Sequence, residues 1–455
     1  MTKRILALLL ACALLLPAAF AAAEELDFTM EPQQESISDE EILQILYHSN
    51  EESDLLSHRL DEQHKTVTIL THYSLNAYKP YFEQLLGGEM VQIICGAQEY
   101  SSKLANLVAS GQIPDLVVSE SSTNPTFVTL ANAGLVQPFD AYIDYSAPEL
   151  ADLQPFYEAG LWNGQHYLAP FDNKPLYYLV YNPAIFEEYG LETPWELWEK
   201  GEWTWDAFRD AAQRLNVTDG DGNYICYGTS APSYGAFSGA TGVDYMQLGD
   251  GTLTLNLNDP GITRAENFIN DMLFKDDIIK IKAQNSWSSY WTRGMLGMQI
   301  IDSWMLDGNG DITPAIRAGR CMVAPLPQDP QNNVPGEYRT YAQSGGFCLV
   351  NGAQNPEGAA MFIRMLAYVN RYFISLDGET EQEALAKKHE AGETNQFLYQ
   401  RHVSRDISHA TVSFGYAFMA QHGIWGFMVQ QNNWTSFVES VLPKAQESIR
   451  EMLGE

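Results

Sequence analysis

The sequence predicts an α/β protein in which parallel strands alternate with helices. The chain has 455 residues, a length that suits two domains or one large two-lobed unit. Hydrophobic residues make up 45% and charged residues 18%, so the chain can build a large core. From Thr66 onward, short β-branched runs alternate with segments of helical periodicity. This order is typical of parallel strands joined by crossover helices.

The folded body is expected to start near Lys65. Strands are predicted over Thr66–Thr71, Val91–Cys95 and Leu116–Val118, and helices over Ala77–Leu86, Ser101–Ser110, Met361–Val369 and Trp434–Leu453. Ligands of parallel sheets bind beyond the carboxyl ends of the strands. The candidate rim of a binding site therefore contains Tyr73, Ser74, Glu120, Ser121 and Ser122.

The charge balance excludes two classes of partner. The chain has 26 Lys and Arg against 58 Asp and Glu, a formal net charge of -32. Such a chain repels the phosphates of nucleic acids and the headgroups of anionic lipids. We therefore expect no nucleic-acid partner.

Residues 1–23 are predicted to be a secretory signal peptide. A basic start at Lys3 and Arg4 precedes the apolar run Ile5–Leu16, and small-residue cleavage sites follow. The run is too short for a resident membrane helix, and a buried N-terminal helix is the less favoured alternative. We expect an exported protein at the extracellular face of the membrane, in the cell wall or in the periplasm.

Two features near this segment leave alternatives open. Cys12 loosely resembles a lipidation site, but the apolar run continues past it, so we favour cleavage near Ala21 or Ala23 over lipidation. Residues 24–64 contain thirteen acidic residues and one basic residue, Arg59. We interpret this segment as a charged linker, with a short helix over Asp39–Tyr47 as the alternative.

Several motifs resemble those of one family. The run from Lys103 to Gly111, followed by Ile113–Val117, resembles the K-L-x-x-x-x-A-S-G-x-x-P-D-x-V segment of bacterial extracellular solute-binding proteins. Further matches follow in the family's order at Ala131–Phe139, Gly164–Pro170, Leu179–Phe186, Gly190–Pro194, Trp203–Phe208, Trp291–Met298, Asp302–Trp304, Ala324–Pro327 and Ser344–Phe347. Each match is weak alone, but their shared order covers about Lys65 to Leu453. The branch that they resemble is the sugar-binding, maltodextrin-receptor-like one, which serves ABC importers.

The resemblance implies a two-lobed, periplasmic-binding-protein-like fold of type II, with a ligand cleft between the lobes and a hinge of crossing segments. Lobe 1 is expected over 65–173 plus 345–400, and lobe 2 over 177–342 plus 406–455. The hinge is expected near Asp172–Tyr178 and Tyr341–Gly346. Pro175 and the pair Gly345-Gly346 suit backbone that bends or approaches a ligand closely.

The implied function is capture of a carbohydrate, with an oligosaccharide favoured, and its delivery to the membrane permease of an ABC transporter. A sugar has a polar edge of hydroxyls and an apolar face, so its receptors combine carboxylates with flat aromatic rings. Trp304 matches the family's stacking ring, with a core Trp as the alternative, and Asp302 lies two residues before it. Asp172 and Asn173 match a cleft position where the first crossing leaves lobe 1, and a loop cap or surface charge is the alternative for these two and for Asp302. We expect a monomer and no cofactor.

Five further residues complete the candidate site. Glu120 and Ser121 end a strand and can bind hydroxyls, and Gly345 lies at the second crossing. Tyr234 and Trp425 are weaker aromatic candidates, and core packing is the favoured alternative for both.

Metal and catalytic motifs are weak. The loops that begin at Asp219 and Asp307 have the initial spacing of a calcium loop, but both lack the required Gly and the closing Glu. The four cysteines after Cys12 lie far apart, so we expect free, mostly buried thiols and no metal site.

Two other functions suit the same composition. A secreted glycoside hydrolase would need two carboxyls about 5–5.5 Å or about 6.5–9.5 Å apart. Nothing in the spacing of Glu120, Asp172 and Asp302 requires this, so we expect no enzymatic activity. The other alternative is a sensor subunit that presents the same cleft to a membrane kinase.

Overall fold

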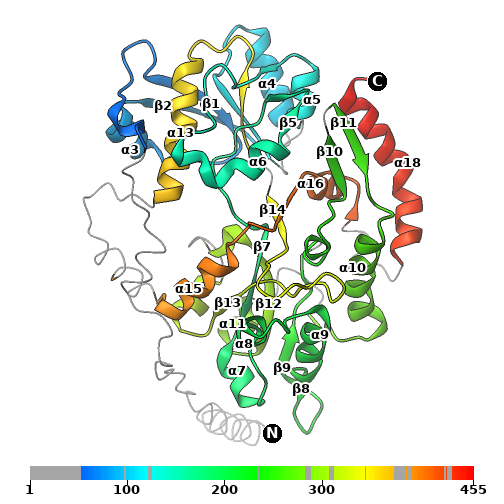
Figure 1. Cartoon of the computed structure of the whole chain (residues 1–455). Coiled ribbons are helices and arrows are strands. Elements are labelled where there is room, and N and C mark those ends of the chain that lie inside the picture. The colour runs from blue at the N-terminus through cyan, green and yellow to red at the C-terminus, as the bar shows by residue number, and fades with distance from the viewer. Residues whose placement is uncertain are drawn as a thin grey trace, which may run out of the picture. The chain divides into compact units, whose positions relative to one another are not determined.

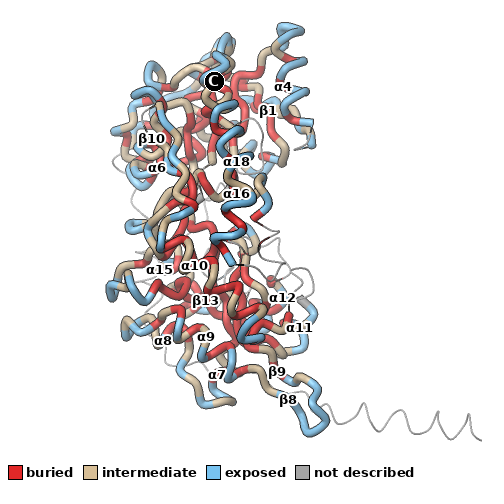
Figure 2. Tube along the Cα trace, turned by 90° about the vertical axis from the view of Figure 1, so that its right-hand side faces the viewer, coloured by how far each residue is buried: buried red, intermediate tan, exposed pale blue. Residues whose placement is uncertain are grey.

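Two five-stranded sheets organise the computed structural model of this chain (Figure 1). The structure describes residues 53–96, 99–120, 126–233, 235–249, 251–281, 288–306, 312–343, 345–372, 386, 392–424, 427 and 433–455. All of them belong to the larger of the two units into which the chain divides, residues 35–455. Figure 2 shows the buried segments of both sheets between exposed turns and helix faces.

Some predictions fall outside the described residues. They are the signal peptide at 1–23 with Cys12, the acidic segment up to residue 52, and the site candidates Ser121, Tyr234 and Trp425. No helix within the described ranges is long and apolar enough to cross a membrane.

The first sheet has the strand order β2-β1-β3-β15-β4. Its strands are β1 (Thr66–Thr71), β2 (Glu89–Ile94), β3 (Leu116–Ser119), β4 (Val136–Gln137) and β15 (Gly346–Val350). β1 runs parallel to β2 and β3, as predicted. β15 returns from far along the chain and runs antiparallel between β3 and β4.

Helices pack around this sheet and bury its core. They are α3 (Lys79–Tyr81), η2 (Phe82–Leu86), α4 (Tyr100–Ala109), α5 (Phe127–Asn132), η4 (Pro148–Leu153), α6 (Gln154–Ala159) and α13 (Pro356–Tyr372). The Thr126 hydroxyl accepts a hydrogen bond from the Thr129 amide and so caps α5. Phe82 and Phe362 meet edge to face in the core, with ring centroids 5.1 Å apart. A short hairpin, β5 (Leu161–Trp162) and β6 (Gln165–His166), follows α6.

The folded body begins earlier than Lys65, which corrects the predicted linker boundary. Leu55, in the helical turn η1 (Leu55–Ser57), is fully buried in the first core. The Arg364 Nε on α13 donates to buried Glu149 at 2.6 Å, and its Nη2 donates to Asp54 at 3.1 Å. These contacts fasten the chain at residues 53–57 onto the first sheet's helices.

The second sheet has the strand order β13-β7-β12-β9-β8. Its strands are β7 (Tyr177–Tyr181), β8 (Val217–Thr218), β9 (Tyr224–Thr229), β12 (Leu296–Asp302) and β13 (Met322–Ala324). The helices associated with it are α7 (Pro183–Glu188), α8 (Pro194–Glu199), α9 (Trp205–Arg214), η5 (Ser238–Thr241), α10 (Pro260–Asn270), η6 (Asp271–Lys275), α11 (Ser288–Thr292), η7 (Ser303–Leu306) and α12 (Thr313–Arg317). β12 is antiparallel to β7 and parallel to β9.

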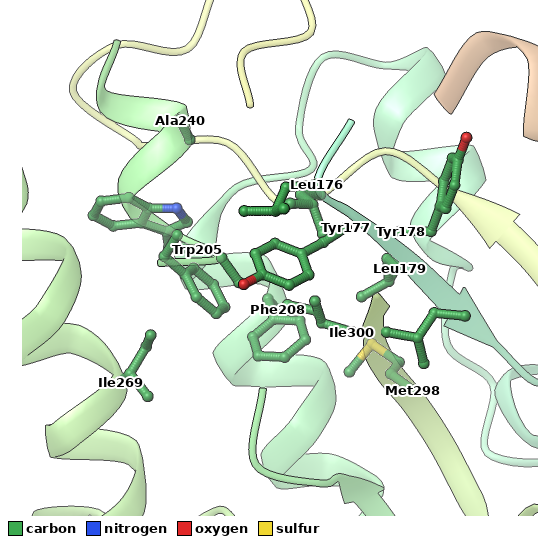
Figure 3. Close-up of a cluster of buried hydrophobic side chains, with 14 of the residues drawn as sticks. Leu176, Tyr177, Tyr178, Leu179, Trp205, Phe208, Ala240, Ile269, Met298 and Ile300 are labelled. Carbon is green, nitrogen blue, oxygen red and sulfur yellow. The ribbon is translucent and has the colours of Figure 1, made fainter. Parts of the chain in front are cut away.

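Aromatic residues dominate the second core. Figure 3 shows Tyr177 of β7 next to Trp205 and Phe208 of α9, with Ile300 of β12 beside Phe208. Tyr177 and Trp205 are 1% and 2% exposed, respectively. β9 and α9 approach so closely that a Cβ atom on Gly228 would lie 1.9 Å from the carbonyl oxygen of Ala212. Only glycine allows this packing of strand on helix.

Three described segments lie between the two sheets. The first leads into β7, and the second joins β14 (Tyr341–Gln343) to β15. The third runs from the end of α15 (Asn395–Ser404) to β16 (Thr411–Ser413), alongside the other two (Figure 1). β14 pairs in parallel with β16, and Pro175 forms a bridge with Ala342. The predicted crossings near Asp172–Tyr178 and Tyr341–Gly346 therefore lie side by side.

The C-terminal helices pack differently from the expected division. α15 (Asn395–Ser404) packs on β13, and the Gln400 side chain accepts from the Val323 amide at 3.2 Å. The sequence predicts residues 345–400 in lobe 1, but 395–400 lie on the second sheet.

The last helix has the predicted bounds. α18 (Trp434–Leu453) begins after Asn433, whose side chain caps it. It packs on α10 and, near its C-terminal end, on α5 of the first sheet. α16 (Gly415–Gln421) packs on the hairpin of β10 (Met246–Gly249) and β11 (Thr252–Leu255). Figure 1 shows α16, this hairpin and α18 in the same region of the molecule.

Candidate functional site

Glu120 lies just after β3, among polar groups from neighbouring segments. The Tyr73 hydroxyl donates a hydrogen bond to Glu120 Oε1 at 2.9 Å, and His72 Nε2 lies 3.8 Å from Oε2. His72 and Tyr73 follow β1, which is parallel to β3, so these side chains meet at the carboxyl ends of the two strands. Burial raises the pKa of Glu120, while the Tyr73 hydrogen bond and the charge of Lys174 oppose this rise.

The glycine pair at the second crossing lies beside Glu120. A Cβ atom on Gly345 would lie 3.0 Å from Glu120 Cγ, and one on Gly346 would lie 2.3 Å from the carbonyl oxygen of Ala169. Neither glycine adopts the left-handed backbone conformation. The pair therefore provides close approach of segments rather than a sharp bend.

Asp172 lies between two cations at the first crossing. Lys174 Nζ lies 2.9 Å from Asp172 Oδ2, and Arg405 Nη2 donates to Oδ1 at 3.0 Å. Arg405 Nε also donates to the carbonyl oxygen of Asn173 at 3.4 Å. Burial acts to raise the pKa of Asp172, but Lys174 and Arg405 outweigh it and hold the pKa below its usual value. Since Lys174 also acts on Glu120, it couples the two carboxyl groups electrostatically.

Asp302 and Trp304 lie at the end of β12. The Ser233 hydroxyl donates to Asp302 Oδ1 at 3.3 Å. Burial raises the pKa of Asp302, while hydrogen bonds from Trp304 and Ser233 oppose this rise. The Trp304 residue is 53% exposed, in contrast to the fully buried Trp203, Trp205 and Trp434. This exposure excludes the alternative that Trp304 is a core residue.

Leu176 connects these groups through the backbone. Its carbonyl oxygen accepts from the Ser303 amide at 3.1 Å, and its own amide donates to Tyr341 at 2.8 Å. Asp302 is paired with Tyr177 in the ladder of β12 and β7. The first crossing therefore runs between the end of β12 and β14. We name the residues gathered along these crossings the crossing site: Tyr73, Glu120, Asp172, Asn173, Lys174, Asp302, Trp304, Gly345 and Arg405.

Two other features bear on chemistry. Asp219 Oδ1 accepts hydrogen bonds from the amides of Asp221 and Asn223, as in a solvated turn. Cys95, Cys226, Cys321 and Cys348 are free thiols, and the last three are buried, as the sequence predicted. Glu120 also lines a pocket that is open to solvent and has an enclosed volume of about 50 Å³.

The sequence model of the family described as bacterial extracellular solute-binding protein matches residues 87–367, more than half of the chain. The chain belongs to this family. Comparison of this solute-binding protein with curated protein sequences gives no match.

Solved structures confirm the two-lobed fold class. The galacto-N-biose-/lacto-N-biose I-binding protein of an ABC transporter from Bifidobacterium longum matches with a TM-score of 0.61 and 16% identity, over 87% of this chain and 99% of that chain. An ABC substrate-binding protein from Listeria monocytogenes in complex with cycloalternan has a TM-score of 0.57 and 15% identity, over 87% and 100%. The cyclic α-maltosyl-1,6-maltose binding protein from Arthrobacter globiformis has a TM-score of 0.57 and 15% identity, over 85% and 98%.

Sequence reasoning missed two cations of the solute-binding protein's crossing site. Lys174 is adjacent to the predicted pair Asp172 and Asn173, so its neighbours could have indicated it. Arg405 lies 233 positions from Asp172 and no motif marks it. Arg405 reaches Asp172 because the third segment, which contains Arg405, runs alongside the first crossing.

Proposed function

We propose that this solute-binding protein captures a carbohydrate at the crossing site and delivers it to the membrane permease of an ABC transporter. One observation carries the proposal: an exposed Trp304 ring lies beside a partly buried Asp302 at the edge of the second sheet. A flat ring can cover the apolar face of a sugar while a carboxylate accepts from its hydroxyls. The named ligands of the similar structures, lacto-N-biose and cycloalternan, support an oligosaccharide.

The remaining residues take complementary roles in this proposal. Glu120 and Asp302 accept hydrogen bonds from hydroxyls, and Asn173 offers both a donor and an acceptor. Gly345 keeps the second crossing clear beside Glu120. Ser121, Tyr234 and Trp425 stay in the proposed site on sequence grounds.

The two lobes are proposed as the moving parts. We now assign lobe 1 to about 53–173 plus 345–372, and lobe 2 to about 177–342 plus 395–455. Binding closes them about the three crossing segments, since a few residues at such crossings absorb domain motion. The signal peptide at 1–23 exports the protein, which acts as a monomer without a cofactor.

A receptor and a hydrolase give different results with the same oligosaccharide. The raised pKa values of Glu120 and Asp302 are also a property of glycosidase acids, so the distinction needs a direct test. Incubation of the purified protein with maltotetraose, followed by chromatography, should return the intact sugar. Release of shorter products would show that the protein is a hydrolase and not a receptor.

A thermal-shift screen against mono- and oligosaccharides tests capture itself. A ligand at 100 times its Kd should add about 2.7 kcal/mol to the free energy of unfolding. If no carbohydrate raises the melting temperature, the proposal fails. A gene for a sensor kinase rather than a permease beside this one would favour the sensing role.

A further inference from the structure

The pocket next to Glu120 has a composition unlike that of the crossing site. It is open to solvent, and its enclosed part has a volume of about 50 Å³. One wall comes from the first sheet, where Ser119 and Glu120 end β3 and Phe127 begins α5. The other wall comes from the β10–β11 hairpin, α16 and the end of α18, which Figure 1 places in one region.

Most of the lining is apolar. Phe127 and Phe414 lie with their ring centroids 5.7 Å apart, and Phe418 adds a third ring. Leu248 and Leu253, paired across the hairpin, also face the pocket. Against these apolar side chains, a sugar hydroxyl would lose its water hydrogen bonds without replacement, at a cost of about 1–3 kcal/mol for each group. An apolar group would instead gain by leaving water.

Polar groups of the lining gather on the first-sheet side. Three of them, Ser119, Glu120 and Thr126, lie at the end of β3 and the start of α5, whereas the fourth, Gln421, ends α16 on the opposite wall. Glu120 is a member of both the pocket lining and the crossing site. The pocket is therefore continuous with the site that we propose for the carbohydrate.

We propose that this pocket binds an apolar substituent, aryl or branched alkyl, that is attached to the carbohydrate held at the crossing site. The natural ligand is then a glycoside with an apolar aglycone rather than a bare oligosaccharide. This inference rests on the proposed function for the sugar half of the ligand. The apolar half depends only on the pocket.

The size of the effect follows from the buried area. Moving a phenyl ring from water into an apolar pocket stabilises a complex enough for an affinity gain of about tenfold or more. Methyl α-maltoside and phenyl α-maltoside form a matched pair that differs in this ring. Calorimetric titration of the wild-type protein should give a Kd for the phenyl glycoside at least about tenfold lower.

Two variants of the β10–β11 hairpin test whether the higher affinity for the phenyl glycoside arises in this pocket. Leu248→Trp fills the pocket from β10, whereas Gln247→Trp places the same ring on the exposed face of that strand. The phenyl preference should disappear in Leu248→Trp and persist in Gln247→Trp, with the methyl glycoside bound equally by both. If Leu248→Trp does not fold, Leu253→Trp fills the pocket from the partner strand.

The outcomes separate this inference from the proposed function. Equal binding of the two glycosides by the wild-type protein overturns the apolar pocket and leaves the carbohydrate receptor intact. If neither glycoside binds, phenol serves as a sugar-free probe by saturation-transfer NMR. Phenol binding that Leu248→Trp abolishes supports the pocket, and absence of phenol binding overturns it.

Discussion

The side chain of Glu120 packs against Gly345. A Cβ atom added to Gly345 would lie 3.0 Å from Glu120 Cγ. Glu120 belongs to the end of β3, and Gly345 to the second crossing. The position of the carboxylate therefore depends on a glycine more than two hundred residues away.

The glycine pair gives a matched prediction. Gly345→Ala should displace Glu120 by a few tenths of an ångström and weaken sugar binding, with a small change in stability, because a side chain can move. Gly346→Ala should destabilise the fold by about 1–3 kcal/mol, because the new Cβ would meet the Ala169 carbonyl at 2.3 Å. Urea unfolding and calorimetry on both variants check this. Equal stability of the two variants would show that Gly346 does not pack tightly against the Ala169 carbonyl.

Truncation of Trp304 should act on binding and not on folding. An aromatic anchor commonly contributes 2 kcal/mol or more, so Trp304→Ala should weaken carbohydrate binding by roughly 30-fold. The apo variant should keep its circular dichroism spectrum and melting temperature, because the residue is 53% exposed. Trp203→Ala serves as the contrast, since that ring is 1% exposed and its loss should destabilise the fold. Unchanged affinity of Trp304→Ala would remove Trp304 from the site.

The ion cluster of the first crossing should respond asymmetrically to substitution. Asp172→Asn leaves both Lys174 and Arg405 without their shared carboxylate, whereas Arg405→Met still leaves Lys174 2.9 Å from Asp172. We expect Asp172→Asn to lower the free energy of unfolding by about 1–3 kcal/mol, and Arg405→Met by less. Denaturant unfolding at low salt measures both. A larger loss in Arg405→Met would mean that the guanidinium, and not the carboxylate, organises the crossing.

A buried carboxyl beside the third crossing gives a pH prediction. Asp244 accepts from the Ser413 hydroxyl at 2.7 Å and from the amides of Phe414 and Gly415. Burial nevertheless raises its pKa to about 6. The folded state therefore binds more protons than the unfolded state between about pH 4 and pH 6, so stability falls as pH rises through this window.

Asp244→Asn should remove that part of the pH dependence. The wild-type protein should lose on the order of 3 kcal/mol more than the variant between pH 4 and pH 7. The amide can still accept from the backbone at this position, so the variant should fold. Asp221→Asn, in an exposed turn, is the control and should follow the wild type. Parallel stability curves for the wild type and Asp244→Asn would contradict the prediction.

Local patterns predicted those elements whose signals are local. β1 and β3 are β-branched or apolar runs, and α18 has the predicted bounds because its cap and its apolar face are both encoded within twenty-one residues. The contact of α15 with β13 carries no such signal, since it is fixed by the return of the chain over the second sheet.

The candidate site divides in the same way. Family motifs mark the positions of Trp304, Asp302 and Asp172, and the end of a strand marks Glu120, so the sequence alone proposes these four residues. Arg405 was missed, since its role depends on a crossing segment that no periodicity describes. The early start of the folded body was missed because Leu55 and Leu56 lie within an acidic stretch, and the partners of this segment, such as Arg364 for Asp54, are distant in sequence.

The end of α18 is held against α5 of the other sheet. The Asn132 side chain donates to the Met452 carbonyl at 2.7 Å, two residues before the terminal pair Gly454 and Glu455. A purification tag or fluorescent protein fused at Glu455 would therefore begin at the contact between the two lobes, where its bulk can hold them apart. A small dye attached there would instead change its surroundings whenever that contact opens, which makes this terminus a place to build an optical sensor of the ligand.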